Sequence, residues 1–262
     1  MMKQTFSFFC SFLLFAVLML LTGCYGHRQV GLLQDRKDLP HYDSVGYQPY
    51  RLQVNDEIVY RIISLDQTVA KTMIYAMGNN VGSNYNNAYP YRIYPDGTVD
   101  LPFTRAVRLE GLTETEAQDT VKRYIREIIP DAEVKLAMYN KYFTVLGDIS
   151  PGVRYIYKDR MTIYQALAMT GDLLNSGDRR HVRIIRPHGN AEPEVLEFDL
   201  RTNTLIDSKY YYIYPNDLIY VSREPAAFFK QDSYTAFLGI ITSSVSLLVS
   251  VLTYITYIPG VK

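Results

Sequence analysis

Residues 50–60 read YRLQVNDEIVY, and this stretch sets the pattern for the fold. Alternating apolar residues on both sides of Asn55-Asp56 predict a strand, a tight turn and a second strand. Residues 214–221, YPNDLIYV, repeat the arrangement, with Asn216-Asp217 leading into an apolar strand. Asparagine tolerates the positive φ that such a turn requires. The repeat indicates two small modules, each built from strands and a single helix, and the fold class predicted is α+β.

The first module is predicted to occupy residues 49–140. Residues 91–101 alternate around Asp96-Gly97, which predicts a hairpin with its turn at Pro-Asp-Gly. Thr113 precedes Glu116 by three residues, and this capping box predicts the start of a helix that Pro130 ends. A short apolar strand is expected at 134–138.

The second module is predicted to occupy residues 141–223. Strands are expected at 142–146, 182–185 and 195–198, with a turn at Pro151-Gly152. Thr162 and Gln165 form another capping box, and they predict a short helix that ends at Gly171.

The N-terminal segment has the features of an export signal. Residues 6–21 are almost wholly apolar, follow Lys3 and end in Leu-Thr-Gly-Cys24. This ending resembles the lipobox of bacterial lipoproteins, which implies a signal peptide at 1–23 and lipidation of the Cys24 sulfur. An ordinary signal peptide followed by a chance cysteine is the alternative. Residues 24–48 lack a clear period and are predicted to be a tether between the lipid and the first module.

The C-terminal segment has no charged residue from 233 to 261, and residues 233–259 are predicted to form a transmembrane helix. Small or hydroxylated residues recur there every three or four positions, and therefore form one stripe along the helix. The stripe comprises Gly239, Ser243, Ser246, Ser250 and Thr253. It fits either a plain anchor with tolerated serines, or a helix that packs against copies of itself or lines water. The regular spacing favours the second interpretation.

The sequence offers no pattern for catalysis or for metal binding. Lys plus Arg and Asp plus Glu both number 27, so no net charge indicates nucleic acid. Nucleophile-elbow, P-loop and zinc motifs are absent. Asp56 and Glu57 are neighbours on a predicted strand and point to opposite faces, so they cannot flank one bond. We expect no catalytic residue, no metal and no cofactor, with His181 and His188 as solvated strand ends rather than a metal pair.

Two further clusters have more than one interpretation. Four arginines lie close together in sequence and fit contact with an anionic polymer or another subunit better than nucleic acid: Arg179, Arg180, Arg183 and Arg186. On a strand, Tyr210, Tyr212 and Tyr214 would share one face. Structural or intersubunit contacts are favoured for these tyrosines over a platform for sugars.

The order of these features resembles the outer-membrane polysaccharide export family. In the first module the resemblance lies in Tyr50, Leu52, Asp56, Asp96-Gly97, Leu101-Pro102, Gly111-Leu112-Thr113 and Glu116-Ala117. The second module resembles a soluble-ligand-binding β-grasp module through Phe143, Val145, Gly147, Pro151-Gly152, Thr162, Ala166-Leu167, Gly171, Arg186, Asp199-Leu200 and Asn216-Asp217. The family usually has Gly-Asp where this chain has Asn-Asp, and its best-known members have two β-grasp modules rather than one.

The resemblance implies a lipoprotein subunit of an outer-membrane channel that exports capsular or extracellular polysaccharide. It further implies a homo-oligomeric ring, with an octamer as one expectation. The implied partners are the polysaccharide, outer-membrane lipid and an inner-membrane polysaccharide co-polymerase. A periplasmic ligand-binding or sensing lipoprotein, and a polysaccharide-modifying enzyme, are the alternatives.

Overall fold

The computed structural model describes residues 31–65, 90–102, 105–225 and 234–257. The chain divides into two units. Residues 32–174 and 178–222 form one unit, which holds both predicted modules, and helix α5 (Tyr234–Tyr257) belongs to the other. The mixture of helices and sheets confirms the predicted α+β class.

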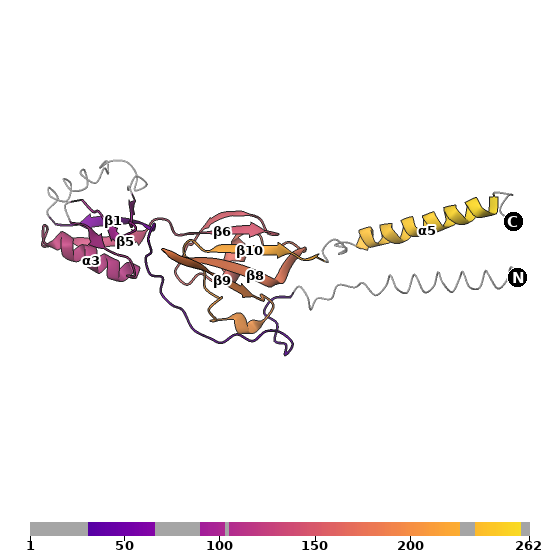
Figure 1. Cartoon of the computed structure of the whole chain (residues 1–262), viewed down its shortest axis with the longest axis horizontal. Helices are drawn as coiled ribbons and strands as arrows, with labels where there is room; N and C mark the ends of the chain where they lie inside the picture. Colours follow the sequence, from indigo (N-terminus) through magenta and orange to yellow (C-terminus); the bar gives the residue numbers. More distant parts are fainter. Residues whose placement is uncertain (1–30, 66–89, 103–104, 226–233, 258–262) are drawn as a thin grey trace. The chain divides into compact units, whose positions relative to one another are not determined.

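The first module is a three-stranded antiparallel sheet with one helix packed against it (Figure 1). The sheet order is β2 (Tyr91–Arg92), β1 (Glu57–Ile63) and β5 (Glu133–Met138). The apolar face of helix α3 (Glu114–Arg126) is buried at every third or fourth position, as expected for a helix lying on a sheet. The buried residues are Ala117, Val121 and Ile125, which join Ile58, Tyr60 and Ile62 of β1 in one core.

The predicted capping box is confirmed at the start of α3. The Thr113 hydroxyl accepts a hydrogen bond from the Glu116 N–H (3.3 Å), and the Glu116 carboxylate accepts one from the Thr113 N–H (2.8 Å). These bonds satisfy two backbone donors that the helix leaves without a partner. The helix therefore begins where the local sequence predicts.

The predicted hairpin at 91–101 is wrong in its strand pairing. The turn itself forms, because Gly97 N–H donates to the Tyr94 carbonyl and Asp96 accepts from the Thr98 N–H. However, β2 pairs with β1, and β3 (Thr98–Val99) pairs with β4 (Val107–Arg108). The residues before the turn contact the Asn55-Asp56 turn instead. The Asn55 N–H donates to the Ile93 carbonyl, and the Ile93 N–H donates to the Asp56 carbonyl. A turn signal cannot choose between such distant partners.

The second module is a mixed five-stranded sheet in the order β7-β6-β10-β8-β9. Its strands are β6 (Tyr142–Gly147), β7 (Gly152–Tyr155), β8 (Gly177–His188), β9 (Ala191–Phe198) and β10 (Leu218–Arg223). Strands β6 and β10 are parallel, whereas β6–β7 and β8–β9 are antiparallel. The short helix α4 (Ile163–Met169) begins at the predicted Thr162–Gln165 capping box, and the 3-10 helix η3 (Asn203–Leu205) follows β9. A second core forms from the inner faces of these elements, with Phe143, Ile163, Leu167, Ile184 and Phe198 among its buried residues.

The described part of the segment predicted to be a tether runs along the second module. Gln34 N–H donates to the Arg201 carbonyl, and the Tyr42 hydroxyl accepts from the Asp199 N–H (3.0 Å). The Tyr42 ring also lies edge-on to Tyr210, with the ring centroids 4.9 Å apart. This stretch is therefore held by backbone and ring contacts. Cys24 lies outside the described residues.

The C-terminal helix is present as α5, Tyr234–Tyr257. Two hydroxyls of the predicted stripe donate to carbonyls of the helix itself, Ser243 to Ile240 (3.0 Å) and Thr253 to Val249 (2.7 Å). Across the parts of the chain that the structure describes, no helix has the combination of length and apolar character needed to cross a bilayer. The structure therefore supports a helix here and gives no support to its prediction as a transmembrane segment.

Candidate functional site at the two Asn-Asp turns

The two Asn-Asp turns have the same local geometry. Asn55 and Asn216 adopt positive φ values of 71° and 66°, as predicted for asparagine at these positions. In each turn the aspartate carboxylate accepts the backbone N–H of the residue three positions earlier. These bonds join Gln53 to Asp56 and Tyr214 to Asp217, both at 2.8 Å. The repeated sequence therefore encodes one turn structure used twice.

The two turns lie against each other, although 160 residues separate them in sequence. The Asn216 side-chain amide donates to the Asp56 carboxylate (3.1 Å), which also accepts the Tyr50 hydroxyl (2.8 Å). The Gly189 N–H adds a bond to the Gln53 side chain (2.8 Å). Asp56 is 1% exposed. Burial raises the pKa of its carboxyl to about 6, although the hydrogen bonds from Gln53, Tyr50 and Asn216 oppose this shift.

The second turn is held by a buried ion pair. The Arg186 guanidinium donates two hydrogen bonds to the Asp217 carboxylate, at 3.0 and 2.8 Å, and a third to the Tyr212 carbonyl. Asp217 is fully buried. Burial raises the pKa of the Asp217 carboxyl, and the Arg186 charge opposes this shift. The guanidinium carbon also lies 4.3 Å from the centre of the Tyr214 ring, a cation–π arrangement.

A row of tyrosines borders the paired turns. The Tyr214 ring stacks between Tyr47 and Tyr50, with both centroid distances at 6.2 Å. The strand predicted for Tyr210, Tyr212 and Tyr214 does not form. Tyr210 lies in a turn, Tyr212 forms an isolated bridge with Thr162, and Tyr214 lies in irregular chain. Tyr210 packs against Phe198 instead, with the centroids 5.3 Å apart. Two-residue alternation therefore does not apply to this segment.

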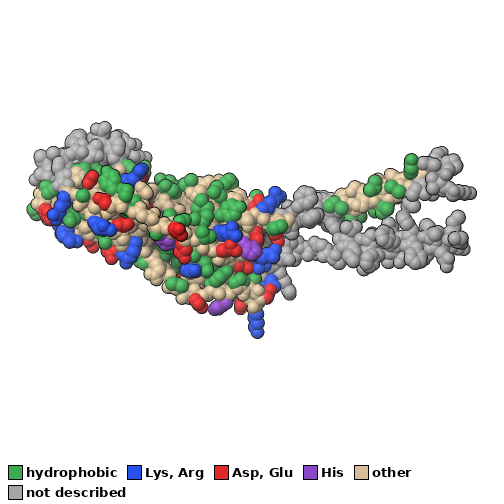
Figure 2. Space-filling model, viewed as in Figure 1, with side chains coloured by type: hydrophobic (Ala, Val, Ile, Leu, Met, Phe, Trp, Pro, Cys, Tyr) green, Lys and Arg blue, Asp and Glu red, His purple; other side chains and the backbone are tan. Residues whose placement is uncertain are grey.

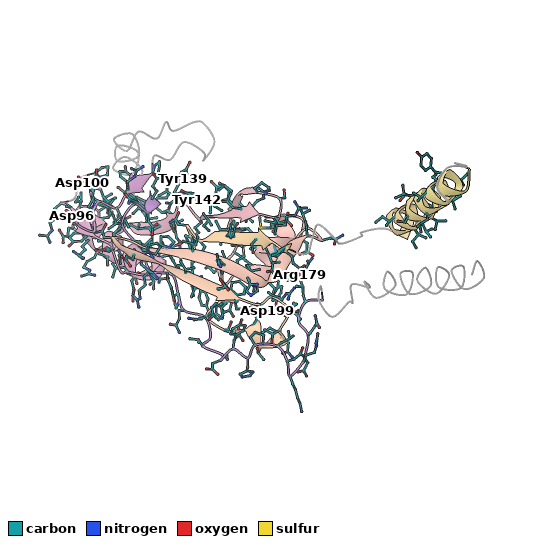
Figure 3. All side chains as sticks on the ribbon, turned by 45° about the vertical axis from the view of Figure 1, so that its right-hand side comes forward. Asp96, Asp100, Tyr139, Tyr142, Arg179 and Asp199 are labelled. Atoms are coloured by element: carbon teal, nitrogen blue, oxygen red, sulfur yellow. The ribbon has the colours of Figure 1, made fainter. Side chains whose placement is uncertain are left out.

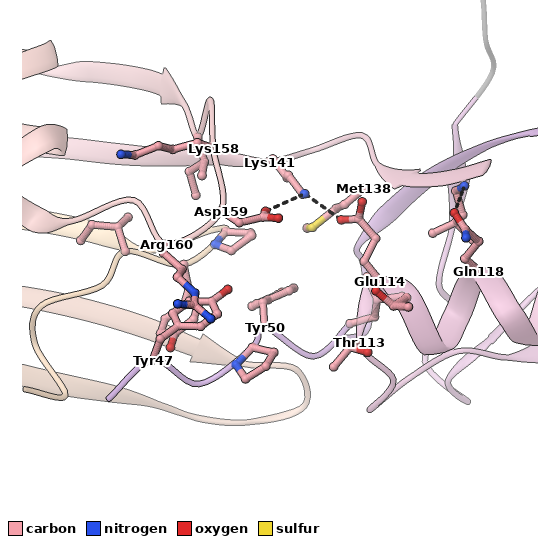
Figure 4. A pocket seen from close by; sticks show the side chains of 18 residues that line it. Tyr47, Tyr50, Thr113, Glu114, Gln118, Met138, Lys141, Lys158, Asp159 and Arg160 are labelled. Carbon is pink, nitrogen blue, oxygen red and sulfur yellow. Dashed lines mark hydrogen bonds and ion pairs between the residues drawn. The ribbon is translucent and has the colours of Figure 1, made fainter. Parts of the chain in front are cut away.

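A cavity of about 350 Å³ opens beside the tyrosine row (Figure 4). Its wall includes the start of α3, the end of β5 and the 156–160 loop. Within it, the Lys141 ammonium lies 2.7 Å from the Glu114 carboxylate and 3.5 Å from that of Asp159. The remaining charged or aromatic residues that line it are Tyr47, Tyr50, Lys158, Arg160 and Tyr214.

The structure separates the predicted turn residues into two groups. It brings both Asn-Asp turns together, and Tyr214 and Pro215 of the second also line the cavity. Asp96-Gly97 and Pro151-Gly152 are not among the lining residues, and Figure 3 shows Asp96 together with Asp100 in the first module. Sequence analysis missed the cavity because its charged residues belong to no motif. The only local signal is the Lys-Asp-Arg run at 158–160.

The four neighbouring arginines do not form a basic patch. Arg183 pairs with Glu197 at 2.6 Å, Arg186 pairs with Asp217, and Arg180 lies 3.8 Å from Asp178. Arg179 is buried and donates to backbone carbonyls. On the face seen in Figure 2, basic and acidic side chains are interspersed over these modules. The predicted contact with an anionic polymer therefore has no support at this cluster.

The two histidines each lie beside a single acidic residue. His181 Nδ1 is 2.8 Å from Asp178, and His188 Nε2 is 3.5 Å from Glu194. Within the described ranges, no group of three or more histidine, cysteine, aspartate or glutamate side chains is placed to hold a metal ion.

The first module matches the model of a known protein family. Residues 46–138 match the family model described as polysaccharide biosynthesis/export protein. This range contains the Asn55-Asp56 turn, the Asp96-Gly97 turn and the whole of α3. These residues therefore match the polysaccharide biosynthesis/export family, which confirms the predicted resemblance for the first module.

Two curated relatives share sequence with a longer part of the chain. Each is an EPS I polysaccharide export outer membrane protein EpsA, one from Ralstonia solanacearum and one from Ralstonia nicotianae. The identities are 25% and 24% over 147 residues. The match covers 53% of this chain and 39% of each relative, so the matched part is well under half the length of these relatives.

Proposed function

We propose that this chain is a subunit of an outer-membrane apparatus that exports capsular or extracellular polysaccharide. The observation that carries the proposal is the export-family domain at 46–138, together with relatives named as outer-membrane export proteins of an extracellular polysaccharide. Deletion of the gene should abolish surface and secreted polysaccharide while precursor accumulates in the cell. Unchanged polysaccharide outside the deletion strain would overturn the proposal.

Lipid attachment at Cys24 is the second part of the proposal. The apolar run at 6–21 followed by Leu-Thr-Gly-Cys supports it, because the thiol of such a cysteine is the acyl acceptor. Two or more acyl chains anchor a protein stably, whereas a single chain does not. The Cys24→Ala variant should take up no labelled palmitate and should leave the outer-membrane fraction. Normal labelling of that variant would contradict lipid attachment.

Self-association is the third part of the proposal. In the single chain, α5 exposes large apolar side chains, including Leu247 (67%) and Val249 (56%). Exposed apolar surface of this kind indicates association. We infer a homo-oligomeric ring, with eight subunits as the working number, that works with an inner-membrane polysaccharide co-polymerase. The stripe at Gly239, Ser243, Ser246, Ser250 and Thr253 is proposed as the contact between α5 helices.

Single cysteines in α5, in a background without other thiols, test this contact. Ser243→Cys and Ser246→Cys should cross-link between subunits under mild oxidation. Val245→Cys and Leu248→Cys, on the other side of the helix, should not. A monodisperse monomer in detergent, or equal cross-linking at all four positions, would contradict the proposed contact.

The cavity favours a second candidate function, that of a periplasmic ligand-binding or sensing lipoprotein. A cavity of about 350 Å³ lies within the range of about 300–1,000 Å³ that is typical of small-molecule sites. The deletion experiment separates the two functions. A sensor would change polysaccharide synthesis but would leave polymer able to reach the cell surface.

A further inference from the structure

The charges that line the cavity do not balance. Lys141, Lys158 and Arg160 supply three positive charges, against two negative charges from Glu114 and Asp159. Lys141 lies in ion-pair distance of both carboxylates. Among the residues that the structure describes, Lys158 and Arg160 have no carboxylate within ion-pair distance. The cavity therefore carries one net positive charge, and Arg160 lies outside ion-pair distance of every described carboxylate.

The aromatic residues of the same cavity suit a sugar ring. Tyr47 and Tyr50 line the cavity with aromatic surface, and the apolar side of a sugar ring can pack against such surface. The Arg160 guanidinium carbon lies 4.9 Å from the centre of the Tyr47 ring, so a cation and an aromatic face lie together (Figure 4). Arg160 has a φ of 57°, an uncommon conformation for a residue other than glycine. Such conformations concentrate at ligand-binding positions.

We propose that this cavity binds a carboxylated sugar residue of an acidic polysaccharide. Arg160 binds the carboxylate, and the sugar ring packs beside the Tyr47 ring. The first turn of α3, at Thr113–Thr115, lines the cavity as well and adds the positive end of the helix dipole. A neutral glycan would leave the net positive charge of the cavity without a counter-charge. The proposal rests on the proposed export function for the source of the ligand, and it names the chemical class of the exported polymer.

Calorimetric titration of the full-length protein in detergent tests the site with two matched probes. Trigalacturonic acid carries a carboxylate on each sugar, whereas maltotriose is neutral. We expect binding of the acidic probe alone, and weaker binding as salt rises, because salt screens the attraction between the charges. Arg160→Gln should weaken binding about tenfold or more, as expected for loss of a charge-assisted hydrogen bond.

Two control variants make the test specific. Arg160→Lys keeps the positive charge and should retain most of the affinity. Arg154→Gln makes the same charge change in β7, outside the residues that line the cavity, and should bind as the unaltered protein does. Circular dichroism establishes that each variant is folded.

The proposal is overturned if trigalacturonic acid does not bind, or if maltotriose binds equally well. It is also overturned if Arg154→Gln weakens binding as much as Arg160→Gln, since the attraction would then be a general effect of charge. These outcomes are independent of the export function, which the deletion strain decides. If the deletion strain loses export but trigalacturonic acid does not bind, the proposed site is wrong and the export function stands. If the acid binds but the deletion strain still exports polysaccharide, the export function is wrong and the site stands.

Discussion

The pair between Arg186 and Asp217 gives the sharpest test of how the second Asn-Asp turn is held. Asp217→Asn keeps the size of the side chain but removes its charge. The 12% exposed Arg186 side chain then stays in the module without its counter-ion. Breaking one partner of a buried ion pair costs about 3–5 kcal/mol, because a buried charge is left uncompensated. We expect a loss of this size in the free energy of unfolding, measured by urea titration and circular dichroism on the full-length protein.

An exposed ion pair in the same sheet provides the control. Arg183 and Glu197 pair across β8 and β9, with both side chains nearly half exposed. Glu197→Gln should cost less than about 1 kcal/mol, because solvent screens such pairs. Replacing both partners, in Arg186→Met with Asp217→Asn, should recover part of the loss since no buried charge remains. If Asp217→Asn costs no more than Glu197→Gln, the ion pair is not what holds the turn.

Three further changes test other parts of the fold. Burial raises the pKa of Asp56 from 3.8 to about 6, so the stability that this group contributes is present below about pH 4 and is lost as the pH rises through about 6. Lowering the pH from 7 to 4 should therefore add about 2 kcal/mol through this group, and Asp56→Asn should lack that gain in urea titrations. An identical pH dependence in the variant would contradict burial of the charge. Gly147→Ala should destabilise far more than Gly171→Ala, for which left-handed backbone strain predicts about 1–2 kcal/mol. Both glycines have positive φ, but only at Gly147 would the added Cβ overlap the Val221 carbonyl oxygen. Equal losses of unfolding free energy in the two variants would show that the strand holding Val221 moves freely. Thr113→Ala should cost about 1 kcal/mol in thermal unfolding by removing the cap of α3, and an unchanged midpoint would show that the cap is dispensable.

Local chemistry made several features of this protein predictable from its sequence. Both capping boxes join residues three apart, so Thr113 and Thr162 mark the helix starts without any knowledge of the rest of the fold. The positive φ values of Asn55 and Asn216 follow from the conformational preference of asparagine. These predictions hold because every interacting partner lies within a few residues along the chain.

Tertiary structure alone decided which distant groups meet. The two Asn-Asp turns were recognised as a repeat, but their contact through Asn216 and Asp56 depends on how the modules pack. Strand β2 pairs with β1 and strand β3 pairs with β4, and the turn motif between β2 and β3 determines neither partner. The cavity joins a helix start, a strand end and a loop, and its residues share no sequence pattern. Sheet pairing and cavity formation depend on contacts between residues far apart in the chain. The local spacing of residues in the sequence does not predict those contacts.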